Sequence, residues 1–261
     1  MTIVAYITPL SINLESLIKK QMKTNILRWG LAITAVAGLL SGCLKGNDNP
    51  PPPEQTFLSI MHLAPTAPNV DVYFDNAKVS NTPFVPGNVT PQYNPVDKGI
   101  YSIRFKKAAS DSLVADVGQE KYDSLTYYTI LLYNLLMDGP VRAIRIKDDF
   151  SEVASDLSKP YYRFFHTSPN TGPVDLYIDS IKIQNFRTHA DNAGNVSLNR
   201  FMGTLVDVHK IEVREAGTST VLASQDNVLL QAGHAYTFYF SGLTGGTGEK
   251  QLKLGILPAL R

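Results

Sequence analysis

The feature that most constrains this chain is an internal repeat. Residues 62–75 read HLAPTAPNVDVYFD, and residues 166–179, which begin 104 positions later, read HTSPNTGPVDLYID. We call the shared residues the signature: His62, Pro65, Asp71, Tyr73 and Asp75 in the first copy, and His166, Pro169, Asp175, Tyr177 and Asp179 in the second. A repeat of about one hundred residues has the size of a small domain, so the sequence predicts two tandem domains of one fold.

Around the signature, apolar and polar residues alternate with the period of a β-strand, and prolines or the pairs Asp75-Asn76 and Asp179-Ser180 separate the strands. Each strand is therefore expected to have one buried face. The positions on that face are Leu58, Ile60, His62, Val70, Val72 and Phe74 in the first copy, and Tyr162, Phe164, His166, Val174, Leu176 and Ile178 in the second.

Farther along, the two copies align with an offset of 108. Residues 99–116 match 207–224, residues 125–135 match 233–243, and residues 141–146 match 249–254. Six or seven strands per copy without a helical period favour an all-β fold of two tandem immunoglobulin-like (Greek-key) β-sandwich domains. The expected boundaries are 56–147 for the first repeat, 148–160 for a polar linker and 161–257 for the second repeat.

The N-terminal region has the layout of an export signal. Lys23 and Arg28 precede an apolar run that is too short to span a membrane comfortably and that ends at Cys43. The residues Leu40, Ser41, Gly42 and Cys43 resemble the bacterial lipobox, in which a peptidase cleaves before a cysteine that carries lipid. We therefore expect a signal peptide over 22–42 and a membrane anchor through lipid on Cys43. The alternative is a free cysteine in an ordinary signal peptide or core helix.

Two neighbouring segments complete this picture. Met22, followed by Lys23, is interpreted as the natural start of translation, so residues 1–21 are interpreted as an upstream mis-start extension. Residues 43–55 contain four consecutive prolines, Pro50 to Pro53, and are predicted to form a tether. Leu44 after the cysteine favours the outer membrane as the location in the cell envelope.

Charge and cysteine content exclude some classes of function. The chain carries a net charge of +1, of which residues 1–42 contribute +3, so the remainder is mildly acidic at −2. This gives no electrostatic reason to expect nucleic acid. With Cys43 as the single cysteine, neither an intramolecular disulfide nor a thiolate metal cluster can form.

The paired pattern H-x-x-P followed by V-D-[VL]-Y-[FI]-D resembles the family catalogued as domain of unknown function 4397. Many members are secreted or lipid-anchored bacterial proteins with such β-sandwich units. The resemblance covers residues 56–257 in two copies, which differ at Pro68 and Gly172. It implies an architecture and an envelope setting, and it implies no activity.

His62 with Asp71, and His166 with Asp175, are candidate imidazole–carboxylate pairs for general base catalysis or metal binding. Each histidine lies on an apolar strand face, however, and no nucleophile motif accompanies it. We expect structural roles, no catalytic residues and no cofactor. A calcium site around Tyr73 would need more oxygen ligands than two carboxylates on a strand face, so we expect no metal and assign Asp71 and Asp75 to capping of loop edges.

Other single residues also suggest structural roles. Tyr128 and Tyr236 open equivalent strands, and we expect each hydroxyl to contact backbone a few residues upstream, as in immunoglobulin-like sandwiches. His189, His209 and His234 do not recur in the first copy and are interpreted as surface or rim residues.

Three function classes remain. The preferred one is a non-enzymatic envelope protein whose sandwiches bind another protein or a glycan, or act as spacers. The second is a carbohydrate-binding lipoprotein that uses Tyr73, Tyr177, Tyr161 and Phe165 as outward-facing rings. The third is a hydrolase with a site at His166 and Asp175. Local function is expected in loops 80–98 and 184–206, where the copies differ.

Overall fold

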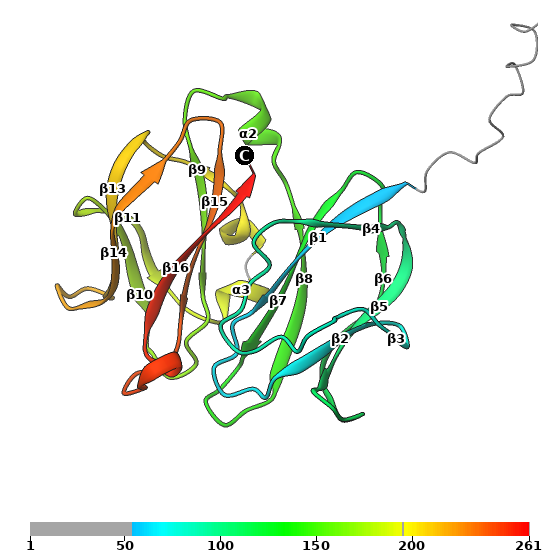
Figure 1. The fold of residues 1–261 in the computed structure, drawn as a ribbon. Helices are drawn as coiled ribbons and strands as arrows, with labels where there is room; N and C mark the ends of the chain where they lie inside the picture. Colours follow the sequence, from blue (N-terminus) through cyan, green and yellow to red (C-terminus); the bar gives the residue numbers. More distant parts are fainter. Residues whose placement is uncertain (1–53, 195, 261) are drawn as a thin grey trace, which may run out of the picture. The chain divides into compact units, whose positions relative to one another are not determined.

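The computed structural model describes residues 54–194 and 196–260 (Figure 1). The predicted mis-start extension, signal peptide, lipobox and Cys43 lie outside the described residues, as does all but the end of the tether. The described residues all lie within one compact unit.

The chain folds almost entirely into strands. The first sandwich, residues 55–148, contains β1 (Gln55–His62), β2 (Val70–Phe74), β3 (Ala77–Lys78), β4 (Asn94–Asp97), β5 (Gly99–Lys107), β6 (Leu113–Tyr122), β7 (Tyr127–Asn134) and β8 (Val141–Asp148). The second sandwich, residues 161–260, contains β9 (Tyr161–His166), β10 (Val174–Ile178), β11 (Ile181–Arg187), α3 (Asp191–Gly194), η2 (Val196–Asn199), β12 (Met202–Gly203), β13 (Asp207–Glu215), β14 (Val221–Leu230), β15 (Ala235–Ser241), η3 (Gly248–Lys250) and β16 (Lys253–Leu260). Helix α2 (Ser151–Ser155) lies between the two. None of the described helices is long and apolar enough to cross a bilayer.

The two copies have the same sheet topology. The first sandwich pairs strands in the orders β4-β1-β7-β8 and β3-β2-β5-β6, and the second in the orders β12-β9-β15-β16 and β11-β10-β13-β14. In each copy the first strand runs parallel to the long strand beside it, β1 to β7 and β9 to β15. The prediction of two tandem immunoglobulin-like β-sandwiches is confirmed.

The predicted apolar faces form the two cores. Strands β1, β7, β2 and β5 enclose the core of the first sandwich, and β9, β15, β10 and β13 enclose that of the second (Figure 1). The residues at their centres are Leu58, Val70, Val72, Ile103, Phe105, Ile130 and Leu132 in the first, and Phe164, Val174, Leu176, Ile211, Val213, Phe238 and Phe240 in the second.

The expectation that each first strand has only one buried face is wrong for β9. All six of its residues are buried, and seven of the eight residues of β7 are buried as well. Their second faces meet in a further apolar cluster, the interface cluster, which joins the two sandwiches. Its buried members are Met61, Leu63, Leu131, Tyr133 and Ile146 from the first sandwich and Phe165 and Leu257 from the second.

The predicted alignment of the closing strands is also wrong. In the first sandwich Tyr133 pairs with Arg142, whereas in the second Ser241, which is 108 positions after Tyr133, pairs with Lys253. The closing strands therefore correspond with an offset of 111, because three more residues lie between the paired Ser241 and Lys253 than between Tyr133 and Arg142. Local sequence similarity could not reveal this, because the two closing strands, VRAIRIKD and KLGILPAL, share little sequence.

The predicted polar linker is a packed segment. Asp148 belongs to β8 and is buried, and Val153 in α2 has no exposed surface. Val153 packs in a cluster with Tyr161 and Phe201 of the second sandwich. Residues 148–160 thus bury side chains rather than only connecting the copies.

Candidate functional site

The signature histidines occupy equivalent buried positions. His62 Nε2 lies 3.2 Å from the carbonyl oxygen of Pro68, and His166 Nε2 lies 3.0 Å from that of Gly172. A carbonyl can only accept, so Nε2 carries the proton in both rings. Burial lowers the pKa of each histidine to about 4, despite the hydrogen bond to the carbonyl. Both rings are therefore neutral at physiological pH.

The first signature aspartates pair with lysines rather than with the histidines. Asp71 Oδ2 lies 2.9 Å from Lys78 Nζ, and Asp175 Oδ2 lies 2.6 Å from Lys182 Nζ. The hydrogen bond from Lys78 lowers the pKa of Asp71. Burial alone would raise the pKa of Asp175, but the hydrogen bond from Lys182 and two backbone N–H groups outweigh it and lower the pKa.

These aspartates also fix a turn on the neighbouring hairpin. Asp71 accepts from the backbone N–H of Ala109 at 3.4 Å, and Asp175 accepts from that of Gly217 at 3.1 Å. Ala109 and Gly217 are equivalent turn residues with φ of 56° and 74°. Each aspartate thus ties β2 or β10 to the turn that follows β5 or β13.

The signature tyrosines and the last aspartate of each signature engage the same neighbouring strand. Tyr73 lies under Lys106, with the ammonium 4.7 Å from the ring centre, and Tyr177 lies under Arg214 at 4.1 Å. Asp75 Oδ1 accepts from the backbone N–H of Ser102 at 2.9 Å. Asp179 makes the equivalent bond to the N–H of Lys210 at 2.8 Å.

Asp75 and Asp179 have positive φ, 50° and 46°, as a tight hairpin requires. The signature is therefore a set of contacts that holds the first hairpin of each copy against the next strand. Neither His62–Asp71 nor His166–Asp175 forms a hydrogen-bonded pair among the described contacts, so the geometry offers no histidine–carboxylate dyad at either place.

Tyr128 and Tyr236 make equivalent contacts at the starts of β7 and β15. The hydroxyl of Tyr128 accepts from the backbone N–H of Asp123 at 3.2 Å, and that of Tyr236 accepts from the N–H of Gln231 at 3.0 Å. Each contact reaches five residues upstream, as expected from the sequence, and ties a loop to the sandwich.

The structure corrects three residues proposed as exposed. Tyr161 and Phe165, suggested as outward rings for a glycan, are 2% and 0% exposed. His209, interpreted as a surface residue, is buried, and its Nδ1 contacts Asp179 while its Nε2 lies 3.0 Å from the carbonyl oxygen of Leu205. Because Tyr73 and Tyr177 lie singly beneath cations, these rings do not form a shared aromatic platform.

A buried ion pair joins the two sandwiches. Arg163, at the centre of β9, donates through Nη1 to Asp148, at the end of β8. The two side chains are 1% and 0% exposed. Arg163 also donates to Thr237 and to Thr129, each at 2.8 Å, so its guanidinium contacts both sandwiches.

Further hydrogen bonds satisfy the carboxylate of Asp148. Thr129 donates to it at 2.7 Å, and the Tyr93 hydroxyl, from the loop before β4, donates to the same oxygen. Burial acts to lower the pKa of Arg163, but the carboxylate of Asp148 outweighs it and the pKa is raised. Burial, strengthened by the charge of Asp148, raises the pKa of Tyr93. The group is thus a charged pair with hydroxyl donors around it.

The ion pair uses positions at which the copies differ. Arg163 corresponds to Ser59, and with the corrected offset Asp148 corresponds to Ala259, whereas Thr129 and Thr237 correspond to each other. Sequence reasoning missed the pair, although a lone arginine in the apolar run YYRFF was a signal that its strand is buried on both faces.

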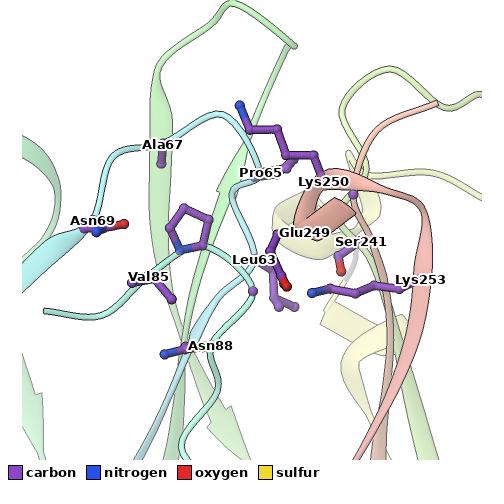
Figure 2. A pocket seen from close by; sticks show the side chains of 13 residues that line it. Leu63, Pro65, Ala67, Asn69, Val85, Asn88, Ser241, Glu249, Lys250 and Lys253 are labelled. Atoms are coloured by element: carbon purple, nitrogen blue, oxygen red, sulfur yellow. The ribbon is translucent and has the colours of Figure 1, made fainter. Parts of the chain in front are cut away.

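A cavity of about 400 Å³ lies beside the interface cluster. One wall is formed by the segment that follows β1 and by part of loop 80–98 (Figure 2). The opposite wall is formed by the end of β15, the start of β16 and the residues just before β16. The side chains that line it include Leu63, Val85, Pro86, Ser241, Glu249 and Lys253.

The other variable loop closes the core of the second sandwich. Arg187 is 2% exposed and donates to the carbonyl oxygen of Phe164 at 3.0 Å, and Asn192 donates to that of His166 at 2.7 Å. Burial lowers the pKa of Arg187, against the opposing charge of Asp191. Loop 184–206 is therefore committed to internal contacts at these residues, whereas loop 80–98 lines the cavity.

Comparison with known proteins finds a family model that matches part of the chain. Residues 56–177 match the model of the family described as domain of unknown function, DUF4397. The match takes in nearly all of the first sandwich and ends in β10, so it includes the first signature and the second as far as Tyr177. No curated protein matches the chain.

Proposed function

We propose that this chain, which contains a DUF4397-like domain, is a non-enzymatic, lipid-anchored protein of the cell envelope whose two sandwiches act together as a protein-interaction or spacer module. The observation that carries the proposal is the commitment of the signature to internal contacts. Its histidines are neutral and buried, and its aspartates hold lysines and backbone N–H groups.

The same contacts argue against hydrolysis at His166 and Asp175. A general base needs a proton acceptor within hydrogen-bonding reach of a substrate. The unprotonated Nδ1 of His166 is enclosed without a partner among the described residues, and the cavity is lined by other residues. A water or substrate hydroxyl cannot be activated where it has no access.

The anchoring part of the proposal rests on sequence. Leu40, Ser41 and Gly42 precede Cys43 in the order of a lipobox, and the prolines that follow favour an extended tether. At about 3 Å per residue, such a tether would hold the body roughly 35 Å from the bilayer. A single body on a tether suits a spacer or a docking platform.

Metabolic labelling tests the anchor directly. The full chain is produced in its native bacterium with a tagged palmitate, and the label on the chain is compared with that on a Cys43→Ser variant. We expect label on the native chain, with none on the variant. Absence of label on the native chain, when a known lipoprotein in the same cells is labelled, would contradict the anchor.

Affinity capture tests the module. The full lipidated chain is crosslinked in its native envelope, and the adducts are identified and compared with those of an unrelated lipoprotein. A reproducible protein adduct supports an interaction module, and a chain without adducts that still fractionates with the outer membrane supports a spacer. Specific retention of a glycan would contradict both.

A further inference from the structure

We propose that the cavity between the two sandwiches binds a small apolar carboxylate. Its carboxylate would be held by Lys253 and Ser241, and its hydrocarbon part would lie against Leu63, Val85 and Pro86. This inference does not depend on the lipid anchor, because it rests on the described residues alone.

The size and lining of the cavity suit a small molecule. Its volume of about 400 Å³ falls within the range of ligand pockets in proteins. Leu63, Pro65, Ala67, Val85 and Pro86 provide an apolar wall from the first sandwich. Asn69 and Asn88 lie beside this wall. A lining that is apolar with a few polar groups suits a hydrocarbon body that carries one polar head group.

Two polar groups in the lining lack partners. Ser241 is 2% exposed, and its hydroxyl makes no hydrogen bond within the part of the chain that the structure describes. Lys253 is half-buried, and no described carboxylate lies within salt-bridge distance of its ammonium. An unpaired buried hydroxyl is costly, and an anionic oxygen ligand would accept a hydrogen bond from it and also pair with the ammonium of Lys253.

The register places these two groups together. Ser241 and Lys253 are directly opposed residues of β15 and β16, so their side chains project from the same face of the sheet. That face is the one that packs on the first sandwich. In Figure 2 the side chain of Lys253 extends towards Leu63, across the space between the two walls.

A difference between the copies accounts for the empty space. The residue equivalent to Ser241 is Tyr133, whose ring is fully buried in the interface cluster. A serine at the matching end of the other sandwich leaves the volume of a phenol ring unfilled.

The wall around Lys253 is fixed by backbone contacts. Gly87 donates its N–H to the carbonyl oxygen of His62 at 2.7 Å, and it has a φ of 93°. A Cβ at Gly87 would lie 2.8 Å from the ammonium of Lys253. The glycine therefore lets the cation approach the backbone of loop 80–98.

Charge sets the class of ligand. The other charged side chains of the lining are Glu249 and Lys250, both exposed. In Figure 2 Glu249 extends towards the cavity while the ammonium of Lys250 points away from it. One cation, Lys253, and one carboxylate, Glu249, therefore face the space. A ligand with a single negative charge can pair with Lys253, whereas a second negative charge on the ligand would be repelled by Glu249.

Isothermal titration calorimetry tests the site with octanoate as the probe, using the full chain with Cys43→Ser to avoid lipidation. We expect saturable binding of one octanoate per chain, and at least about tenfold weaker binding of 1-octanol and octylamine, which lack the carboxylate. Equal binding of octanol and octanoate, or no saturable binding of octanoate at millimolar concentration, would overturn the proposal.

Two kinds of variant locate the site. Lys253→Gln is expected to weaken octanoate binding about tenfold or more, while Arg142→Gln, at the equivalent position of the first sandwich, leaves it unchanged. Ser241→Leu and, independently, Ala67→Phe are expected to fill the cavity and abolish binding. Ala67 is partly exposed, so Ala67→Phe keeps the test valid should Ser241→Leu fail to fold. Unchanged affinity in Lys253→Gln and Ala67→Phe would place octanoate elsewhere and refute the assignment.

Discussion

At the scale of single residues, the signature histidines keep the same hydrogen bond in both copies although the residue that accepts it differs. His62 and His166 use the carbonyl oxygens of Pro68 and Gly172, which are equivalent positions occupied by different amino acids. A backbone acceptor is independent of the side chain, so the contact persists through the change. The sequence predicted the structural nature of these histidines because an apolar strand face leaves little room for a charged ring.

The neutral state of the histidines predicts an acid-sensitive fold. Their folded pKa of about 4 lies below the unfolded value of 6.5, so the unfolded chain binds more protons between these limits. Stability is therefore expected to fall as pH decreases from about 6.5 to 4, by roughly 3 kcal/mol for each histidine over the full range. Urea unfolding at pH 7, 6, 5 and 4.5 measures the change.

The contribution of the histidines is isolated by substitution. The double variant His62→Gln/His166→Gln is expected to lose less stability than the native chain over the same pH interval, because the glutamines do not titrate. Parallel stability curves for the two proteins would show that other groups cause the acid sensitivity.

At the scale of elements, the alternation of apolar and polar residues predicts the strands and both cores, since a period of two fixes which side chains face inward. It does not predict the register of the closing strand. Ser241 pairs with Lys253 only because three more residues lie between them than between Tyr133 and Arg142, and a loop of this length leaves no periodic signal.

The turn after β5 and its equivalent after β13 allow opposite substitutions at equivalent positions. Ala109 and Gly217 both have positive φ, which is costly for alanine and not for glycine. We expect Gly217→Ala to destabilise the fold by about 1 kcal/mol and Ala109→Gly to stabilise it by up to about 1 kcal/mol. Urea unfolding at pH 7 checks both.

Gly172→Ala is the matched control for these turns. Gly172 has open space where a Cβ would lie and does not have positive φ, so this change is expected to be near neutral or slightly stabilising. If Gly217→Ala has the same effect as Gly172→Ala, the turn conformation described here is wrong.

At the scale of the whole molecule, the sequence predicts two sandwiches but does not predict that they pack against each other through a buried interface. The repeat suggests two similar bodies with a linker, whereas β7 and β9 are buried on both faces. The interface depends on Arg163 and Asp148, which have no equivalents in the other copy. An alignment of the repeats identifies only the residues that the copies share, so it does not reveal such positions. The cavity escaped prediction for the same reason, because it arises where Ser241 replaces Tyr133.

The buried ion pair makes a prediction about stability. Arg163→Met leaves the carboxylate of Asp148 buried with hydroxyl partners but no cation, and it is expected to destabilise the fold by about 3 to 5 kcal/mol. The double variant Arg163→Met/Asp148→Leu removes both charges and is expected to cost less than Arg163→Met alone. Additive losses in a double-mutant cycle, followed by urea unfolding, would show that the two side chains do not interact.

The central claim is that the two sandwiches form one body, and native-state hydrogen exchange of the full chain tests it most directly. We predict that the amides of β7 and β9 exchange with the same opening free energy in the native chain. In Arg163→Met the opening free energies of the two strands should differ, so that the amides of one sandwich exchange faster than those of the other. Distinct opening free energies for β7 and β9 in the native chain would contradict the account.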